Sequence, residues 1–136
     1  MSESYTVVER VPTLEEYNRV RKSAGLAVKS ETAARRGIAN SLHSVCVEHS
    51  GNVVGIGRVI GDGGLFYDIV DIAVIAEHQR KGVGGMVMRS LMRYIDTHAP
   101  ATALICLLAN YNVAGFYEKF GFQIRDPGMP AMIIRK

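Results

Sequence analysis

Apolar residues along the chain fall into two patterns, which predict strands and helices. Short runs rich in β-branched and apolar residues indicate strands at residues 5–10, 44–48, 52–60, 65–74, 103–108, 122–125 and 131–134. Apolar residues that recur at helical spacing indicate helices that begin near Thr13, near Ser30, inside the glycine-rich turn at residues 82–85 and at Val113. We therefore expect a mixed sheet flanked by helices, which is an α/β (α+β) fold.

Local start and stop signals support several of these elements. Thr13 followed by Glu16 matches a capping box at the start of a helix, and Gly25 is suited to end that helix. Ser50 and Gly51 separate two β-branched runs, which predicts a hairpin.

The long run at residues 65–74 alternates little between apolar and polar, which is typical of a central strand. With the helix that follows it and the apolar run at residues 103–108, it predicts a parallel strand pair with a right-handed crossover. The long run contains two acids, Asp68 and Asp71. Simple alternation along a strand places their side chains on opposite faces.

A turn rich in glycine and positive charge follows this strand. Its residues are Gln79, Arg80, Lys81, Gly82, Val83, Gly84 and Gly85. Unpaired N–H groups and the helix dipole favour anions at a helix N-terminus, and glycines let a ligand approach the backbone. The turn therefore predicts a cradle for phosphate or pyrophosphate, although a turn that only closes a loop has the same composition.

Two better-known phosphate motifs do not match this turn. Nothing in the chain supplies the GxxxxGK[ST] pattern of a P-loop. A dinucleotide fingerprint would begin at Gly82 and Gly84, but Val87 stands where its third glycine belongs, and the acid that binds ribose is missing.

Composition places the chain among globular proteins. At 136 residues with 48% apolar content, it is expected to form a single domain over residues 1–136. No apolar run is long enough to cross a membrane, and the N-terminus does not resemble a signal peptide, so the expected location is cytoplasmic. The net charge of +3 is not concentrated in runs, which argues against nucleic acid as a partner.

Cysteines and histidines supply no clear metal or redox site. Cys46 and Cys106 each lie in an apolar run and are expected to be reduced core thiols, with a disulfide or a nucleophile as alternatives. The four histidines are scattered, and no pair has the helical spacing of metal ligands, so we expect no metal.

Two motifs together resemble the GNAT superfamily of acetyl-CoA-dependent N-acetyltransferases. The first is the turn, where Gln79, Gly82 and Gly84 match the family signature after the strand end Asp71-Ile72-Ala73-Val74. The second is Asn110-Tyr111-Asn112-Val113-Ala114-Gly115-Phe116-Tyr117, continuing to Phe122, which looks like the motif on the helix after the fifth strand. The resemblance covers residues 52–125.

This resemblance implies a fold and a cosubstrate site. The fold would be a twisted, mostly antiparallel sheet of six to seven strands with about four helices, splayed between the fourth and fifth strands. Acetyl-CoA would bind with its pyrophosphate on the backbone of the turn and its pantetheine arm along Ile72, Ala73 and Val74. Either Asn110 or Asn112 would contact that arm, although both are also suited to cap a helix.

The resemblance also implies catalytic roles for two side chains. Tyr117 matches the tyrosine that protonates the departing CoA thiolate, although it also fits the apolar stripe of its helix. Asp68 falls where some family members have a catalytic carboxylate; a water relay, a pair with an arginine or simple attraction of a cationic substrate are the alternatives.

The expected function is transfer of acetyl from acetyl-CoA to a primary amine by direct attack. A GNAT-like module that binds or senses CoA without turnover is the alternative. Two carboxylates near the expected cleft favour a small cationic amine as acceptor, and the resemblance leaves a homodimer open.

Overall fold

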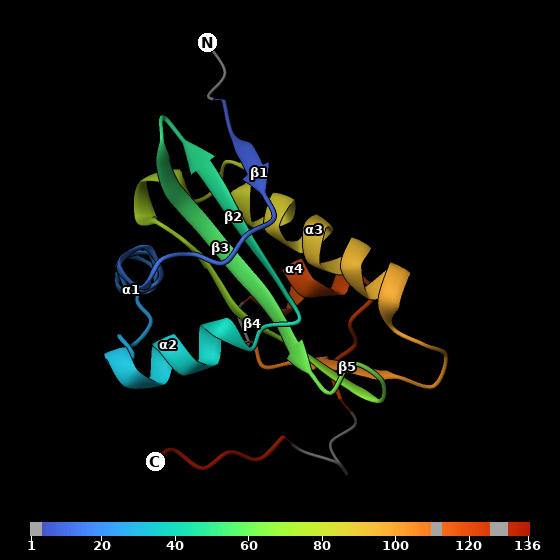
Figure 1. Cartoon of the computed structure of the whole chain (residues 1–136). Coiled ribbons are helices and arrows are strands. Elements are labelled where there is room, and N and C mark those ends of the chain that lie inside the picture. The colour runs from blue at the N-terminus through green and yellow to red at the C-terminus, as the bar shows by residue number, and fades with distance from the viewer. Residues whose placement is uncertain (1–3, 110–112, 126–130) are drawn as a thin grey trace.

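The computed structural model describes residues 4–109, 113–125 and 131–136. They form one five-stranded sheet in the order β1-β2-β3-β4-β5, with four helices and a short 3₁₀ turn, η1 (Figure 1). The strands are β1 (Thr6–Val8), β2 (His43–His49), β3 (Asn52–Gly61), β4 (Phe66–Val74) and β5 (Leu104–Leu107). The helical elements are α1 (Leu14–Ser23), α2 (Glu31–Ala39), η1 (Ala76–His78), α3 (Val83–His98) and α4 (Ala114–Glu118).

The sheet is mixed, as expected. Strands β1 to β4 pair antiparallel in sequence order, whereas β4 and β5 pair parallel across α3. The β2–β3 hairpin is confirmed at Ser50 and Gly51, both of which have positive φ angles. This order places β4 between an antiparallel and a parallel neighbour.

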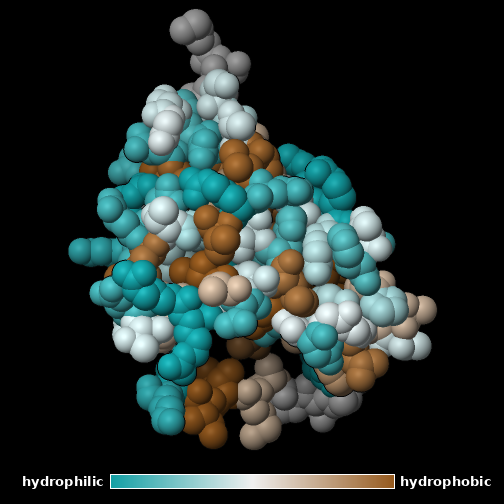
Figure 2. Space-filling model, in the orientation of Figure 1, coloured by the Kyte–Doolittle hydropathy of each residue, from teal (hydrophilic) through white to brown (hydrophobic). Residues whose placement is uncertain are grey.

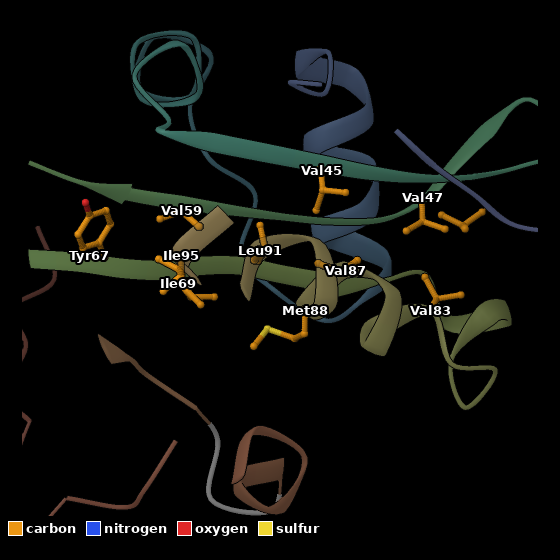
Figure 3. Packing of buried hydrophobic residues seen from close by; sticks show 11 residues of the cluster. Val45, Val47, Val59, Tyr67, Ile69, Val83, Val87, Met88, Leu91 and Ile95 are labelled. Atoms are coloured by element: carbon orange, nitrogen blue, oxygen red, sulfur yellow. The ribbon is translucent and has the colours of Figure 1, made fainter. Parts of the chain in front are cut away.

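Helices cover both faces of the sheet and enclose two clusters of buried residues. Helices α1 and α2 lie on one face over Cys46, Val53, Ile56 and Ala73. Helix α3 lies on the other face, where its Val87, Met88 and Leu91 pack against the sheet (Figure 3). The larger cluster comprises Val45, Val47, Val54, Val59, Tyr67, Ile69, Val83, Val87, Met88, Leu91 and Ile95.

The predicted capping box forms at the start of α1. Thr13 Oγ1 accepts a hydrogen bond from the N–H of Glu16, and the Glu16 carboxylate accepts one from the N–H of Thr13. Ser30 caps α2 in the same way through the N–H of Ala33. None of the helices in the described ranges is long and apolar enough to span a bilayer.

The expectation of six to seven strands is not met, because the described residues form five. Residues 122–125 and 131–136 have no regular secondary structure. Phe122 packs against the core, but most of the other apolar side chains are exposed, with Ile124 at 65% and Ile134 at 96%, so little packing supports a strand there. Figure 2 shows apolar surface at the lower end of the molecule, where the C-terminal segment lies.

A β-bulge in β4 overturns the alternation argument for Asp71. Ile56 pairs with Ala73 but Arg58 pairs with Val70, so Gly57 opposes two residues of β4. Asp71 takes up the extra residue with φ 61° and turns its side chain toward α1. The neighbours of Asp68 along the strand, Tyr67 and Ile69, point into the core on the α3 face, so the Asp68 side chain points to the other face. Asp68 and Asp71 therefore both lie on the α1 side of the sheet.

Candidate active site

A cleft of about 1010 Å³ lies at the C-terminal end of β4. Its lining comes from the β4 residues 68–74, the turn after η1, the start of α3 and helix α4. A second hollow of about 1160 Å³ lies between α3, β5 and α4, and Asp68 and Tyr117 border both. These two side chains therefore stand where the hollows meet.

The cleft lies where β4 continues beyond the last residue that pairs with β5. Their parallel pairing runs from Phe66–Leu104 to Ile69–Leu107, while β4 continues to Val74. Ile72, Ala73 and Val74 border the cleft beyond the last of these pairs. Within the described residues, β5 does not pair with this part of β4, which is the place that the resemblance assigns to the pantetheine arm.

The turn before α3 brings backbone N–H groups to the same cleft. Gly82 is the N-cap of α3 and has φ 86°, a left-handed conformation that suits glycine. The first N–H bonded within the helix is that of Met86, to the Gly82 carbonyl, so the N–H groups before it are free of helical partners. Gly84 and Gly85 also border the cleft. The geometry suits an anion.

The side chains of the other residues in this turn differ in whether they border the cleft. Arg80 borders the cleft, whereas the Val83 side chain is 1% exposed and packs in the core, so Val83 offers only its backbone. Gln79 donates a hydrogen bond from Nε2 to the Val74 carbonyl. Lys81 is exposed and does not line the cleft.

The position of Tyr117 is compatible with both predicted roles, a catalytic acid and a packing residue of its helix. Its ring lies edge-on to Phe116, 5.0 Å between centroids, and packs against the α3-side cluster. It also borders the cleft. Burial raises the pKa of its phenol, so the hydroxyl stays protonated at neutral pH and can act as an acid.

Asp68 faces Cys106 across the β4–β5 pair. The Cys106 thiol donates a weak hydrogen bond to Asp68 Oδ1 at 3.7 Å, and no arginine contacts Asp68 within the described ranges. Burial raises the pKa of the Asp68 carboxyl, which strengthens it as a base once ionised. Cys106 is exposed, so its expected place in the core is wrong; Cys46 is buried, and both thiols are free.

Asp71 is held in a buried ionic cluster with Tyr17, Arg21 and Arg58. Its Oδ1 accepts from Arg21 Nη1 at 2.5 Å, and its Oδ2 accepts from Arg58 Nε at 2.6 Å and from the Tyr17 hydroxyl at 2.9 Å. Both oxygens are occupied, so Asp71 is not a candidate base. Sequence reasoning missed this cluster, although an arginine inside the β-branched run at residues 52–60 signalled a buried partner.

Comparison with known proteins identifies the family. The sequence model of the acetyltransferase (GNAT) domain matches residues 39–124. The chain belongs to the GNAT acetyltransferase family. The match contains β2 to α4 and therefore the whole turn and both Asp68 and Tyr117.

Solved structures of other proteins are similar to this chain. A probable acetyltransferase of unknown function from meticillin-resistant Staphylococcus aureus is 35% identical, with a TM-score of 0.93 over 98% of this chain and 100% of that one. A GNAT acetyltransferase of Brucella melitensis in complex with acetyl-CoA has a TM-score of 0.66 at 21% identity, over 90% of this chain and 84% of that one, which shows the fold alone.

A curated relative, the uncharacterized N-acetyltransferase ycf52 of Porphyra purpurea, is 34% identical over 80 residues. The aligned part is 59% of this chain but 44% of that relative, so the chain spans less than half of its length.

Two predicted residues of the GNAT site, Asn110 and Asn112, lie outside the described residues. Among the residues that the structure does describe, no group of three or more His, Cys, Asp or Glu side chains is arranged to hold a metal ion.

Proposed function

We propose that this GNAT domain transfers an acetyl group from acetyl-CoA to a small primary amine. The observation that carries the proposal is that one cleft joins the anion-binding turn at the start of α3 to Asp68 and Tyr117. The turn fits a pyrophosphate, because Gly82 and Gly84 present backbone without side chains. The acceptor amine and the acyl donor would then meet beside the part of β4 that borders the cleft, residues 68–74.

In this mechanism the amine attacks the thioester carbonyl directly. A C–N bond forms as the C–S bond breaks, and a backbone N–H near Val74 stabilises the negative charge on the carbonyl oxygen. Asp68 accepts a proton from the amine, directly or through water, and the Tyr117 hydroxyl gives its proton to the CoA thiolate. The reaction needs no covalent intermediate on the chain.

The test is release of free thiol from acetyl-CoA across a panel of primary amines. We expect thiol release that depends on the amine and is matched by the acetylated product. Gly84→Glu should abolish acetyl-CoA binding, because its carboxylate would enter the cleft and repel the pyrophosphate. Gly37→Glu, on α2 with no atom within 4 Å of the new Cβ, is the matched control.

Two outcomes would contradict the proposal in different ways. Binding of acetyl-CoA without thiol release for any amine would instead support a CoA-binding module. Unchanged affinity in Gly84→Glu would show that the turn is not the cradle. Size-exclusion chromatography of the same samples would test for a homodimer.

A further inference from the structure

Two largely buried arginines, one of which borders the cleft, share a single carboxylate. The side chains of Arg21 and Arg58 are 9% and 14% exposed, and both pair with Asp71, whose side chain is 8% exposed. Within residues 4–109, 113–125 and 131–136, Asp71 is the one carboxylate in contact with either guanidinium. The cluster therefore has one more positive than negative charge.

The other contacts of these arginines are neutral. Arg21 Nε donates to the Ala27 carbonyl, and Arg58 Nη1 donates to the Gly37 carbonyl and to Ser41 Oγ. Carbonyl and hydroxyl oxygens satisfy donors but do not cancel charge. An unbalanced charge in a buried site is costly unless an anion comes to it, so the cluster favours binding of an anion.

Arg21 borders the cleft, together with Ala24, Leu26 and Asp68. Asp68 lies on the same face of β4 as the cluster, and no lysine, arginine or histidine of residues 4–109, 113–125 and 131–136 forms an ion pair with it. The cleft thus has an acidic side at Asp68 and a basic side at Arg21. A ligand with both an amine and an anionic group complements this arrangement, whereas a polyamine complements only half of it.

We propose that the acceptor is a small amine that also carries a carboxylate or phosphate, with its anionic group beside Arg21 and its amine beside Asp68. This inference rests on the proposed acetyltransferase function and specifies its substrate class. It replaces the simple cationic amine that two free carboxylates would have favoured, because Asp71 is neutralised and Arg21 is not balanced.

Matched pairs of amines test the proposal with the intact protein. The pairs are 4-aminobutyrate with 4-aminobutanamide and phosphoethanolamine with ethanolamine, and spermidine serves as the polycation. We expect at least a tenfold higher kcat/KM for the anionic member of one pair, mainly through a lower KM. The preferred pair distinguishes a carboxylate from a phosphate.

Arg21→Gln tests the role of the arginine itself. The variant should fold, because Arg58 still neutralises Asp71. Its preference for the anionic amine should fall to within threefold, while its affinity for acetyl-CoA stays unchanged. Arg21→Lys should keep part of the preference. Arg19→Gln is the matched control, since Arg19 lies on α1, bonds the Val53 carbonyl and does not line the cleft.

The wild-type panel decides the matter even if Arg21→Gln fails to fold. Equal kcat/KM within both pairs, or a preference for the neutral members or for spermidine, would overturn the inference and leave the acetyltransferase function intact. Absence of thiol release with every amine, despite bound acetyl-CoA, would overturn the proposed function itself.

Discussion

The side chain of Gln79 is bonded to the backbone of Val74, with 2.9 Å between Nε2 and the carbonyl oxygen. This hydrogen bond joins the last residue of β4 to the residue that follows η1. It holds the loop at the point where the strand end and the glycine turn both border the cleft. Gln79 therefore supports the candidate cosubstrate site by linking the end of β4 to the loop that leads into the glycine turn.

Gln79→Leu should weaken acetyl-CoA binding by roughly 2- to 12-fold, the range that one lost hydrogen bond of about 0.5–1.5 kcal/mol predicts. The loop would lose its link to β4 while the α3 N-terminus stays intact. Isothermal titration with acetyl-CoA measures the effect. Gln123→Leu, in the segment after α4, is the control and should bind normally. Equal affinities for both variants would rule out this supporting role.

Tyr117→Phe should lower kcat by about a hundredfold, the lower end of what a general acid contributes. Its affinity for acetyl-CoA should change little, because the ring keeps its packing against Phe116. Since burial raises the pKa of the phenol, the wild-type enzyme should lose no activity to ionisation of Tyr117 below about pH 10.

Steady-state rates over a pH series measure both effects of Tyr117. Tyr94→Phe is the matched control, because Tyr94 stacks between His43 and His98 and does not line the cleft. A Tyr117→Phe enzyme with the wild-type kcat would leave the residue with a packing role only.

Asp68→Asn should remove the acid limb of the profile of kcat/KM against pH that a carboxylate base produces. A base works only when ionised, so activity falls as the pH drops through its pKa. Burial raises the pKa of Asp68, so this limb should lie above the value of about 4 that is usual for an aspartate.

The control for Asp68 is Asp96→Asn, which changes an exposed aspartate on α3. The Asp96→Asn enzyme should keep the wild-type profile. If Asp68→Asn also keeps it, ordered water rather than this carboxylate deprotonates the amine.

Local signals in the sequence predicted those parts of the fold that depend on neighbouring residues. The capping box at Thr13, the helix start near Ser30 and the turn at Gly82 each depend on a few adjacent positions, and the structure has all three. The apolar stripe of α3 was likewise predictable, because Val87, Leu91 and Ile95 recur at helical spacing.

The errors arose where distant residues decide the outcome. Alternation failed for Asp71 because a bulge opposite Gly57 inserts one residue, and its partners come from α1 and β3. The final two strands failed because β-prone composition does not guarantee a partner strand or a buried face. The same applies to Cys106, which lies on the parallel edge strand with an open face.

Gly57→Ala should destabilise the fold by roughly 1–3 kcal/mol, the usual cost of overpacking a core. A Cβ on Gly57 would lie 2.4 Å from Val87 Cγ1 and 2.8 Å from Ile72 Cδ1, so α3 or the β4 bulge would have to shift. Equilibrium unfolding in urea should show a lower midpoint. Because the bulge carries Asp71 and borders the cleft, affinity for acetyl-CoA should fall as well.

Gly37→Ala is the matched control for Gly57→Ala, since Gly37 lies within α2 and an added Cβ meets no atom within 4 Å. Alanine is favoured over glycine in a helix by about 0.5–1 kcal/mol, so this variant should unfold at a higher urea concentration than the wild type. Opposite shifts from the same chemical change would show that Gly57 is required for close packing of α3 on the sheet. A Gly57→Ala midpoint at or above the wild-type value would contradict that packing.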